Sequence, residues 1–330
     1  MHFYCEKCKR EYPLDTMSYR CACGGLFRLF KRSEDEIKTE ISLGEVCTPL
    51  RKVIFDRMEV TLKLDQLQPT GSFKDRGAFT LVNALHNLGI QKIVEDSAGN
   101  AAAAIASYAA AAGMDCLIYL PADVSAAKEK QIAAVGAKIT KIEGSRDFVA
   151  TQVRRETKAR YYASHVFNPL FFEEIKSMAR EIYEQLGNSV PDYIFIPVGN
   201  GTMLLGLYYG FVEIGRLPKF VAVQSEQCQP LCQVLENKPV HRMGKTIAAS
   251  IQVGRPPRLL EMVKAVKNSQ GSAMAVSEEE ILSALDFLGK QGIYAEISAA
   301  AALAGARKFF GQGKPDNYKV VIPITGSGMK

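Results

Sequence analysis

The sequence predicts an α/β fold in which parallel β-strands alternate with helices. From Thr48 onward, short apolar runs of strand length alternate with helical patterns of about ten to fifteen residues, which is typical of βαβ units. Apolar residues make up 47% and charged residues 23% of the chain, a composition typical of globular proteins. The length of 330 residues is sufficient for two packed domains.

The strands and helices follow in order from these patterns. The expected strands cover 62–66, 92–96, 116–120, 138–142, 193–198, 220–224 and 319–324. The expected helices cover 72–88, a segment that starts just after Asn100 and stops at Gly113, 125–135, 147–158, a segment after the glycine turn at 199–201, 277–288 and 297–310. Gly113 suits the position just after a helix C-terminus, and Ser277 with Glu280 forms a capping box at a helix start.

The charge of the chain limits the classes of partner. The net charge is +6, without a run of five or more Lys or Arg, so we expect neither nucleic acid nor a membrane surface as a partner. A mildly basic chain suits anionic small molecules such as phosphates. The polar N-terminus MHFYCEKCKR does not resemble a signal peptide, and the apolar stretch 101–113 is too short to span a bilayer. We therefore expect a cytoplasmic protein.

Residues 1–30 form a separate small module with four of the eight cysteines, and the charged segment 31–47 is expected to be a connector. Cys5 and Cys8 are separated by twelve residues from Cys21 and Cys23. Two such pairs can meet across a hairpin and surround a structural Zn²⁺, which would supply the folding energy that so small a module lacks. The alternative is a set of unrelated reduced thiols, which is how we interpret the remaining cysteines, Cys47, Cys116, Cys228 and Cys232.

Lys74 lies in the segment PTGSFKDRG at 69–77, directly after a strand and in the first turn of a helix. The positive end of the helix macrodipole disfavours the charged form of an amine. A neutral amine is what a Schiff base with a carbonyl compound requires. A lysine at such a position can also be a solvated surface charge, but the residues around Lys74 favour the chemical interpretation.

Three further turns follow expected strands. SAGN at 97–100 and GNGT at 199–202 both precede helices, so their backbone N–H groups can bind anions. The side-chain amide of Asn100 can form a hydrogen bond with a hydroxyl group of a ligand, or Asn100 can be a simple N-cap. TGSG at 325–328 ends the last strand, and the Thr325 hydroxyl can meet a heterocyclic nitrogen or belong to a plain turn.

These segments carry a resemblance when they are taken together. PTGSFKDRG, SAGN, GNGT, AEISAAAALAG and TGSGMK occur in this order, and the set resembles fold-type II (tryptophan synthase beta-like) pyridoxal-phosphate (PLP) enzymes, in particular threonine synthases. The segment 245–251 with Gly254 and Pro256 also resembles a stretch that lines the site in that family. The resemblance implies two three-layer α/β/α domains with PLP in the cleft between them: a large domain of 48–95 and 168–330, and a small mobile domain of 96–167. A homodimer is the default for the family.

The resemblance also implies roles for individual residues. Lys74 would bind the cofactor as a Schiff base and move protons during catalysis. The remaining cofactor-binding residues would be Phe73, Asn100, Gly199, Asn200, Gly201, Thr202 and Thr325. The substrate would be bound by Ser97, Ala98, Gly99 and Asn100. A hydroxyl such as that of Thr325, unlike an Asp, is expected to leave the pyridine nitrogen of PLP unprotonated, which favours elimination and replacement chemistry.

The implied activity is that of a PLP-dependent lyase of the threonine synthase type, which converts O-phospho-L-homoserine and water to L-threonine and phosphate. Ala98 and the run 101–104 stand where threonine synthases usually carry hydroxyl residues. Two enzyme alternatives therefore stay open: β-replacement on O-phosphoserine or O-acetylserine, as in cysteine or cysteate synthases, and deamination of serine or threonine. An alternative of another class is a non-catalytic scaffold that binds PLP and zinc.

Overall fold

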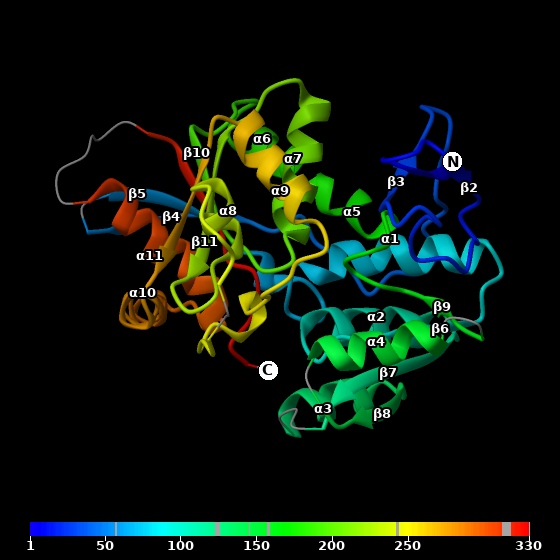
Figure 1. Ribbon diagram of the computed structural model, residues 1–330. Coiled ribbons are helices and arrows are strands. Elements are labelled where there is room, and N and C mark those ends of the chain that lie inside the picture. Colours follow the sequence, from blue (N-terminus) through cyan, green and yellow to red (C-terminus); the bar gives the residue numbers. More distant parts are fainter. Residues whose placement is uncertain are drawn as a thin grey trace. The chain divides into compact units, whose positions relative to one another are not determined.

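The computed structural model in Figure 1 describes residues 1–56, 58–122, 126–144, 146–156, 159–241, 244–311 and 318–329. The chain divides into two compact units. The first unit comprises Met1–Glu45 and Lys74–Glu174, and the second comprises Val46–Phe73 and Ile175–Met329.

The first unit begins with a small antiparallel sheet of order β2-β1-β3, formed by β1 (His2–Cys5), β2 (Glu11–Tyr12) and β3 (Phe27–Phe30). Phe3 and Phe27 stack inside it with ring centroids 5.7 Å apart. The Tyr161 hydroxyl of the same unit donates a hydrogen bond to the main-chain oxygen of Leu14 at 3.0 Å, which ties the module to the rest of the unit. Residues 31–45 form neither helix nor strand, as expected for a connector.

The larger sheet of the first unit has four parallel strands in the order β8-β7-β6-β9. Its strands are β6 (Lys92–Glu95), β7 (Asp115–Pro121), β8 (Lys138–Ile142) and β9 (Tyr161–Tyr162). The helices are α1 (Lys74–Asn87), α2 (Asn100–Ala111), α3 (Ala126–Ala134), α4 (Arg146–Glu156) and α5 (Leu170–Glu173). Helix α1 packs against α2 and α5, and α2 also packs against β7 (Figure 1). Because the strands are parallel, the loops that lead from them into helices lie at the carboxyl edge of this sheet.

The second unit contains a six-stranded sheet of order β12-β11-β10-β13-β5-β4. All neighbouring strands run parallel except β4, which is antiparallel to β5. The strands are β4 (Leu50–Phe55), β5 (Met58–Lys63), β10 (Tyr193–Pro197), β11 (Lys219–Ser225), β12 (Ser272–Val276) and β13 (Val320–Pro323). The helices are α6 (Ile175–Gln185), α7 (Thr202–Ile214), α8 (Pro230–Leu235), α9 (Leu259–Asn268), α10 (Glu278–Lys290) and α11 (Ile297–Phe310), with short 3₁₀ turns η1 (Asp65–Leu67) and η2 (Ala249–Ile251).

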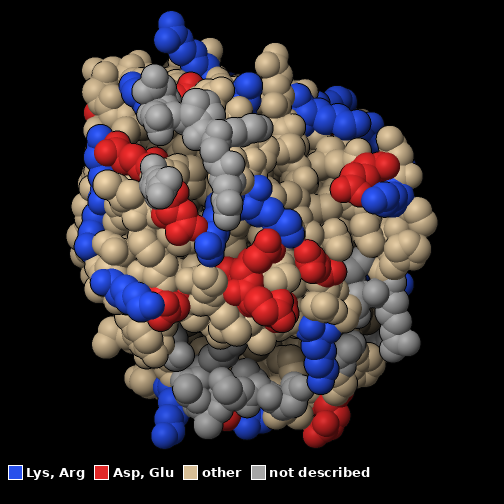
Figure 2. Space-filling model, turned by 90° about the vertical axis from the view of Figure 1, so that its left-hand side faces the viewer, with Lys and Arg blue, Asp and Glu red and all other residues tan. Residues whose placement is uncertain are grey.

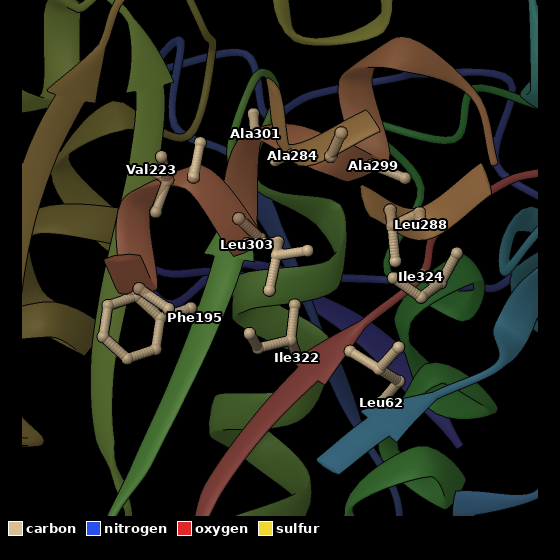
Figure 3. Close-up of a cluster of buried hydrophobic side chains, with 14 of the residues drawn as sticks. Leu62, Phe195, Val223, Ala284, Leu288, Ala299, Ala301, Leu303, Ile322 and Ile324 are labelled. Atoms are coloured by element: carbon tan, nitrogen blue, oxygen red, sulfur yellow. The ribbon is translucent and has the colours of Figure 1, made fainter. Parts of the chain in front are cut away.

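Helices cover both faces of this six-stranded sheet. Val221 and Val223 point into the core under α10 and α11 that Figure 3 shows. Phe220, whose side chain points to the opposite face, packs against Phe211 of α7 with centroids 6.2 Å apart. Small residues allow α11 to lie close to the sheet, because a Cβ on Gly305 would be 2.5 Å from the Val223 side chain. The second unit is thus a three-layer α/β/α arrangement.

The expected α/β fold class is confirmed. The expected strands and helices after residue 60 occur, mostly within two or three residues of their expected ends; residue 125 and residues 157–158 lie outside the described part of the chain. Strands β4 and β12 were not expected. Both lie at edges of the six-stranded sheet, where partial exposure weakens the apolar pattern.

The division into units differs from the expected domains in the positions of α1 and α5, since residues 168–174 were also expected in the large domain but belong to the first unit. The segment 48–95 was expected to belong to the large domain, but Lys74–Glu95 belongs to the first unit because α1 packs on α2 and α5. The mobility of 96–167 stays a prediction. No helix in the described ranges is long and apolar enough to cross a membrane. Figure 2 shows one face of the molecule, on which Lys and Arg are interspersed with Asp and Glu rather than gathered into a single basic area.

Candidate active site

The glycine loop 199–202 joins β10 to α7 in the second unit. Gly201 is the N-cap of α7 and has φ +80°, and a Cβ there would lie 2.0 Å from Met262 Sδ. A Cβ on Gly199 would lie 2.9 Å from the Cα of Ile251. Thr202 Oγ1 is buried and has no hydrogen-bond partner among the residues that the structure describes. Main-chain N–H groups at a helix start, a buried unsatisfied hydroxyl and two glycines whose Cβ atoms would clash together form a cradle for an anion such as phosphate.

A buried glutamine holds this loop in place. Gln224, at 0% exposure on β11, donates from Nε2 to the main-chain oxygen of Val198 at 3.0 Å. Its Oε1 accepts from the main-chain N–H groups of Leu231 at 2.9 Å and Cys232 at 3.2 Å. One amide side chain therefore ties the residue before Gly199 to the first turn of α8.

Residues 71–73 and 325–327 pair through their main chains in the second unit. The N–H of Phe73 donates to the main-chain oxygen of Thr325 at 3.1 Å, and that of Ser327 donates to Gly71 at 2.9 Å. Ser72 and Gly326 form an antiparallel bridge between these bonds. This pairing holds Phe73 beside Thr325 within the second unit.

The carboxylate of Glu296, which no sequence motif marked as a site residue, connects the segment at Thr325 with the region of the glycine loop 199–202. Glu296 Oε1 accepts a hydrogen bond from Thr325 Oγ1 at 3.3 Å, and Glu296 Oε2 accepts one from Ser250 Oγ at 3.5 Å. The main-chain oxygen of Ser250 lies 3.1 Å from where a Cβ on Gly199 would be. Phe73, Thr325, Glu296, Ser250 and the loop from Gly199 thus form one continuous cluster. The two added residues lie in segments that carry the family resemblance, but only their contacts reveal them.

Lys74 is the first residue of α1 in the first unit, as expected. Its side chain is half-buried, and Nζ lies 5.8 Å from the centroid of the Phe171 ring, within cation–π distance. Gly77, one turn along α1, allows this approach, because a Cβ on it would lie 2.2 Å from the Phe171 ring. The amine is therefore held against an aromatic face at the N-terminus of a helix of the first unit.

The loop Ser97–Ala98–Gly99–Asn100 leads from β6 into α2. Gly99 is the N-cap of α2, and its N–H donates to Ser97 Oγ at 3.3 Å. Asn100 is the first helical residue, so the interpretation of Asn100 as the N-cap is wrong. The loop presents N–H groups at the start of a helix that packs against α1, which is an arrangement able to bind a carboxylate.

Buried polar pairs support the base of this loop. His165 Nδ1 and Glu95 Oε1 lie 2.6 Å apart, and both side chains are almost fully buried. The Tyr162 hydroxyl donates to Asp96 Oδ1 at 2.7 Å, and burial together with this carboxylate raises the pKa of Tyr162 well above its usual range. The end of β6 is thereby fixed to the end of β9.

The four N-terminal cysteines come together as expected. Their sulfur atoms all lie within 4.8 Å of one another, with Cys5 and Cys23 at 3.5 Å and Cys8 and Cys21 at 3.4 Å. A tetrahedral Zn²⁺ with Zn–S bonds of about 2.3 Å would require sulfurs about 3.8 Å apart. A hydrogen bond from the Tyr12 hydroxyl lowers the pKa of Cys21 to about 6. The donor set and its spacing fit a structural zinc ion.

A family model described as "Pyridoxal-phosphate dependent enzyme" matches residues 41–326. The chain belongs to this family of PLP-dependent enzymes, which confirms the prediction of a fold-type II PLP enzyme. Among known proteins, it is similar to the threonine synthase of Methanocaldococcus jannaschii, with 30% identity over 374 aligned positions that cover 99% of this chain and 92% of that protein. The threonine synthase of Methanosarcina acetivorans is 32% identical, with 98% and 90% covered. That of Bacillus sp. (strain ULM1) is 34% identical, with 90% and 86% covered.

Solved structures share the fold at lower identity. Serine racemase from Dictyostelium discoideum superposes with a TM-score of 0.74 at 24% identity, covering 86% of this chain and 93% of that one. The processed form of threonine deaminase isoform 2 from Solanum lycopersicum has a TM-score of 0.75 at 22% identity, covering 86% and 80%. These two likenesses concern the fold alone.

Proposed function

We propose that the protein is a threonine synthase-type lyase that converts O-phospho-L-homoserine and water to L-threonine and phosphate. The observation that carries this proposal is the similarity to threonine synthases along nearly the whole chain. The anion cradle at 199–202 and the half-buried Lys74 supply the two features that such an enzyme needs to hold PLP.

Several residues would hold the cofactor. Lys74 would carry it covalently, and the N–H groups of 199–202 with the Thr202 hydroxyl would bind its phosphate, because that buried hydroxyl otherwise has no partner in the described structure. Thr325 would face the pyridine nitrogen, with Phe73 beside the ring, since these two residues are joined by a main-chain hydrogen bond. Asn100 would bind the ring hydroxyl from the start of α2. When bound, PLP supplies an electron-withdrawing ring that makes protons next to the amino-acid nitrogen acidic.

Individual residues of this chain would bind the substrate and transfer protons. The loop 97–100 would orient the substrate by its carboxylate. Lys74, displaced by the substrate amine, would remove the proton from Cα and act next at Cβ. Phosphate would leave as the bond between Cγ and oxygen breaks, the hydroxyl of water would be added at Cβ, and protons would return to Cα and Cγ. The Phe171 ring, 5.8 Å from Nζ, would stabilise the lysine while it carries a proton.

A second enzyme activity is favoured by one observation. The loop Ser97–Ala98–Gly99 offers a single side-chain hydroxyl, and the four alanines at 101–104 of α2 are buried, with at most 3% exposure. Fewer polar groups for a distal phosphate would suit a smaller substrate. β-Replacement on O-phosphoserine or O-acetylserine, or deamination of serine or threonine, is therefore the alternative function.

The test is a comparison of substrates on the holoenzyme and on Lys74→Ala. We expect release of phosphate with an equal amount of threonine from O-phospho-L-homoserine, and loss of both activity and the visible absorbance of lysine-bound PLP in Lys74→Ala. Lys92→Ala, a change at an exposed lysine at the start of β6, should retain both. Cysteine formed from O-acetylserine and sulfide, or 2-oxobutyrate formed from threonine, in the absence of threonine synthesis would replace the proposal by its alternative.

The N-terminal module would bind Zn²⁺ through Cys5, Cys8, Cys21 and Cys23. We expect one zinc ion per purified chain and loss of that zinc in Cys8→Ser, because three thiolates leave a structural tetrahedral site incomplete. The control is Cys47→Ser, a change at an exposed cysteine outside the cluster, which should retain the metal. A fully reduced protein that neither contains nor takes up zinc contradicts this assignment.

A further inference from the structure

Tyr19 of the N-terminal module (residues 1–30) packs against the core of the four-stranded sheet in the first unit. Its ring centroid lies 5.2 Å from that of Phe167 and 5.9 Å from that of Tyr162, and both contacts are edge-to-face. The guanidinium of Arg154 on α4 lies 5.9 Å from the same ring. The half-buried Tyr19 side chain borders a cluster of buried residues from β6, β7, α4 and β9, namely Val94, Tyr119, Val149, Val153 and Tyr162. The module thus contributes an aromatic ring to the core of the sheet.

A second attachment joins the module to the start of α5. The Tyr161 hydroxyl donates to the main-chain oxygen of Leu14 at 3.0 Å and accepts a hydrogen bond from Asn168 Nδ2 at 2.9 Å. Asn168 Oδ1 accepts from the N–H of Leu170, the first residue of α5, at 3.0 Å. These hydrogen bonds are made by other residues than Tyr19, so the module stays attached to the sheet when Tyr19 is substituted.

Tyr162 connects the same core to the loop 97–100. Its side chain is 5% exposed, and its hydroxyl donates to Asp96 Oδ1 at 2.7 Å. Asp96 stands between the last residue of β6 and Ser97, whose hydroxyl accepts from the N–H of Gly99 at 3.3 Å. Tyr162 therefore contacts Tyr19 through its ring and the start of the loop through its hydroxyl.

We propose that Tyr19 is a positioning residue for the loop 97–100 and acts on it through Tyr162 and Asp96. This inference rests on the proposed function, in which that loop orients the substrate by its carboxylate. A ring that is packed on its neighbours has little freedom to tilt, and the hydrogen bond to Asp96 passes this restriction to the main chain before Ser97. The effect of Tyr19 is on substrate binding and not on the chemical step.

The experiment combines amide hydrogen exchange with steady-state kinetics of the holoenzyme. In Tyr19→Ala we expect the amides of residues 97–100 to exchange about 3- to 10-fold faster, because the loss of an aromatic contact makes opening of the loop easier. KM for O-phospho-L-homoserine should rise by about the same factor while kcat changes less than about 2-fold, since ground-state binding alone is weakened. Tyr19→Phe retains the ring and should behave as wild type. If Tyr19→Ala does not fold, Tyr19→Leu serves, because it fills space but lacks the ring.

The control is Phe30→Ala, which removes another aromatic ring of the same module. Phe30 is 44% exposed and stacks on His2 with centroids 4.8 Å apart. This variant should change neither the exchange of residues 97–100 nor KM. A faster exchange of these amides in Phe30→Ala, equal to that in Tyr19→Ala, would show a general loosening of the module and would overturn the inference.

Tyr162→Phe tests the path between Tyr19 and the loop. It retains the ring that contacts Tyr19 but removes the hydrogen bond to Asp96, so it should raise KM to a similar extent. Because both changes interrupt one connection, the double variant Tyr19→Ala/Tyr162→Phe should raise KM by less than the product of the two single effects. Unchanged exchange of the loop in Tyr19→Ala, a fall in kcat at constant KM, or fully multiplicative effects would overturn the inference. A wild-type holoenzyme that does not act on O-phospho-L-homoserine would reject the proposed function instead, and the exchange measurement would still decide whether Tyr19 positions the loop.

Discussion

Substitution of Gly201 by alanine tests whether the glycine loop is a phosphate cradle with a fixed backbone. Gly201 has φ +80°, a conformation that costs an L-residue about 1–2 kcal/mol. The added methyl group would also lie 2.0 Å from Sδ and 2.6 Å from Cγ of Met262, a fully buried side chain. Overpacking of this kind costs about 1–3 kcal/mol. We expect Gly201→Ala to destabilise the protein by about 2–5 kcal/mol in total.

The matched control is Gly215→Ala at the other end of the same helix. Gly215 is the C-cap of α7 with φ +83°, and nothing lies within 4 Å of its Cβ position. It therefore carries the backbone cost of about 1–2 kcal/mol without the steric one. Urea unfolding of the cofactor-free protein, followed by circular dichroism, should show Gly201→Ala to be less stable than Gly215→Ala by about 1–3 kcal/mol. Gly201→Ala is also expected to weaken PLP binding. The double variant Gly201→Ala/Met262→Ala should recover part of this PLP affinity, because it removes the Met262 atoms that would clash with the added methyl group.

The cofactor affinity decides between a structural and a functional role of the loop. A titration with PLP followed by absorbance should give a dissociation constant at least ~10-fold higher for Gly201→Ala, equivalent to about 1.4 kcal/mol. The same constant should be unchanged for Gly215→Ala. Equal stability and equal PLP affinity in the two variants would refute the reasoning, since they would show that neither the steric contact with Met262 nor the loop geometry matters.

Two other substitutions probe charged groups of the second unit. Lys63 is fully buried, and its Nζ lies 2.5 Å from Glu181 Oε2. Glu181→Gln leaves the charge of Lys63 uncompensated and should lower the free energy of unfolding, measured by urea denaturation, by about 3–5 kcal/mol. A loss below about 1 kcal/mol would contradict this prediction. Burial raises the pKa of Glu278, but hydrogen bonds from the Thr246 hydroxyl and the Ile247 N–H outweigh it and hold this pKa below its usual value. The carboxylate therefore contributes stability above its unfolded pKa of about 4.3, and that contribution is lost as the pH falls through the folded pKa. Glu278→Gln should flatten the decline of stability on the acid side of about pH 4.3, and an unchanged acid limb would count against it.

Local patterns in the sequence determine much of this fold. Each βαβ connection combines an apolar run with a helical pattern, and these are visible within about thirty residues. The strand from Leu50 to Phe55 escapes such a pattern because it is a charged, partly exposed edge strand. The position of α1 could not be predicted either, since its packing on α2 and α5 depends on contacts between helices that no local pattern specifies.

The candidate site likewise contains residues that local patterns predict and residues that only tertiary contacts reveal. Lys74, Asn100 and Thr202 are predicted as site residues because each follows an expected strand at the start of an expected helix, a position that favours a neutral amine or an anion-binding group. Glu296 and Gln224 act through partners 29 and 26 residues away, respectively. Their side chains are ordinary in sequence, and only the paired main chains around them give them a role.

The predicted cofactor-binding residues and Glu296 illustrate this difference. The residues predicted to hold the cofactor lie in short motifs, whereas Glu296 is brought to Thr325 by the pairing of two distant segments, 294–296 and 326–328. The motifs identify the family of PLP-dependent enzymes, whereas a contact such as that between Glu296 and Thr325 follows only from the fold.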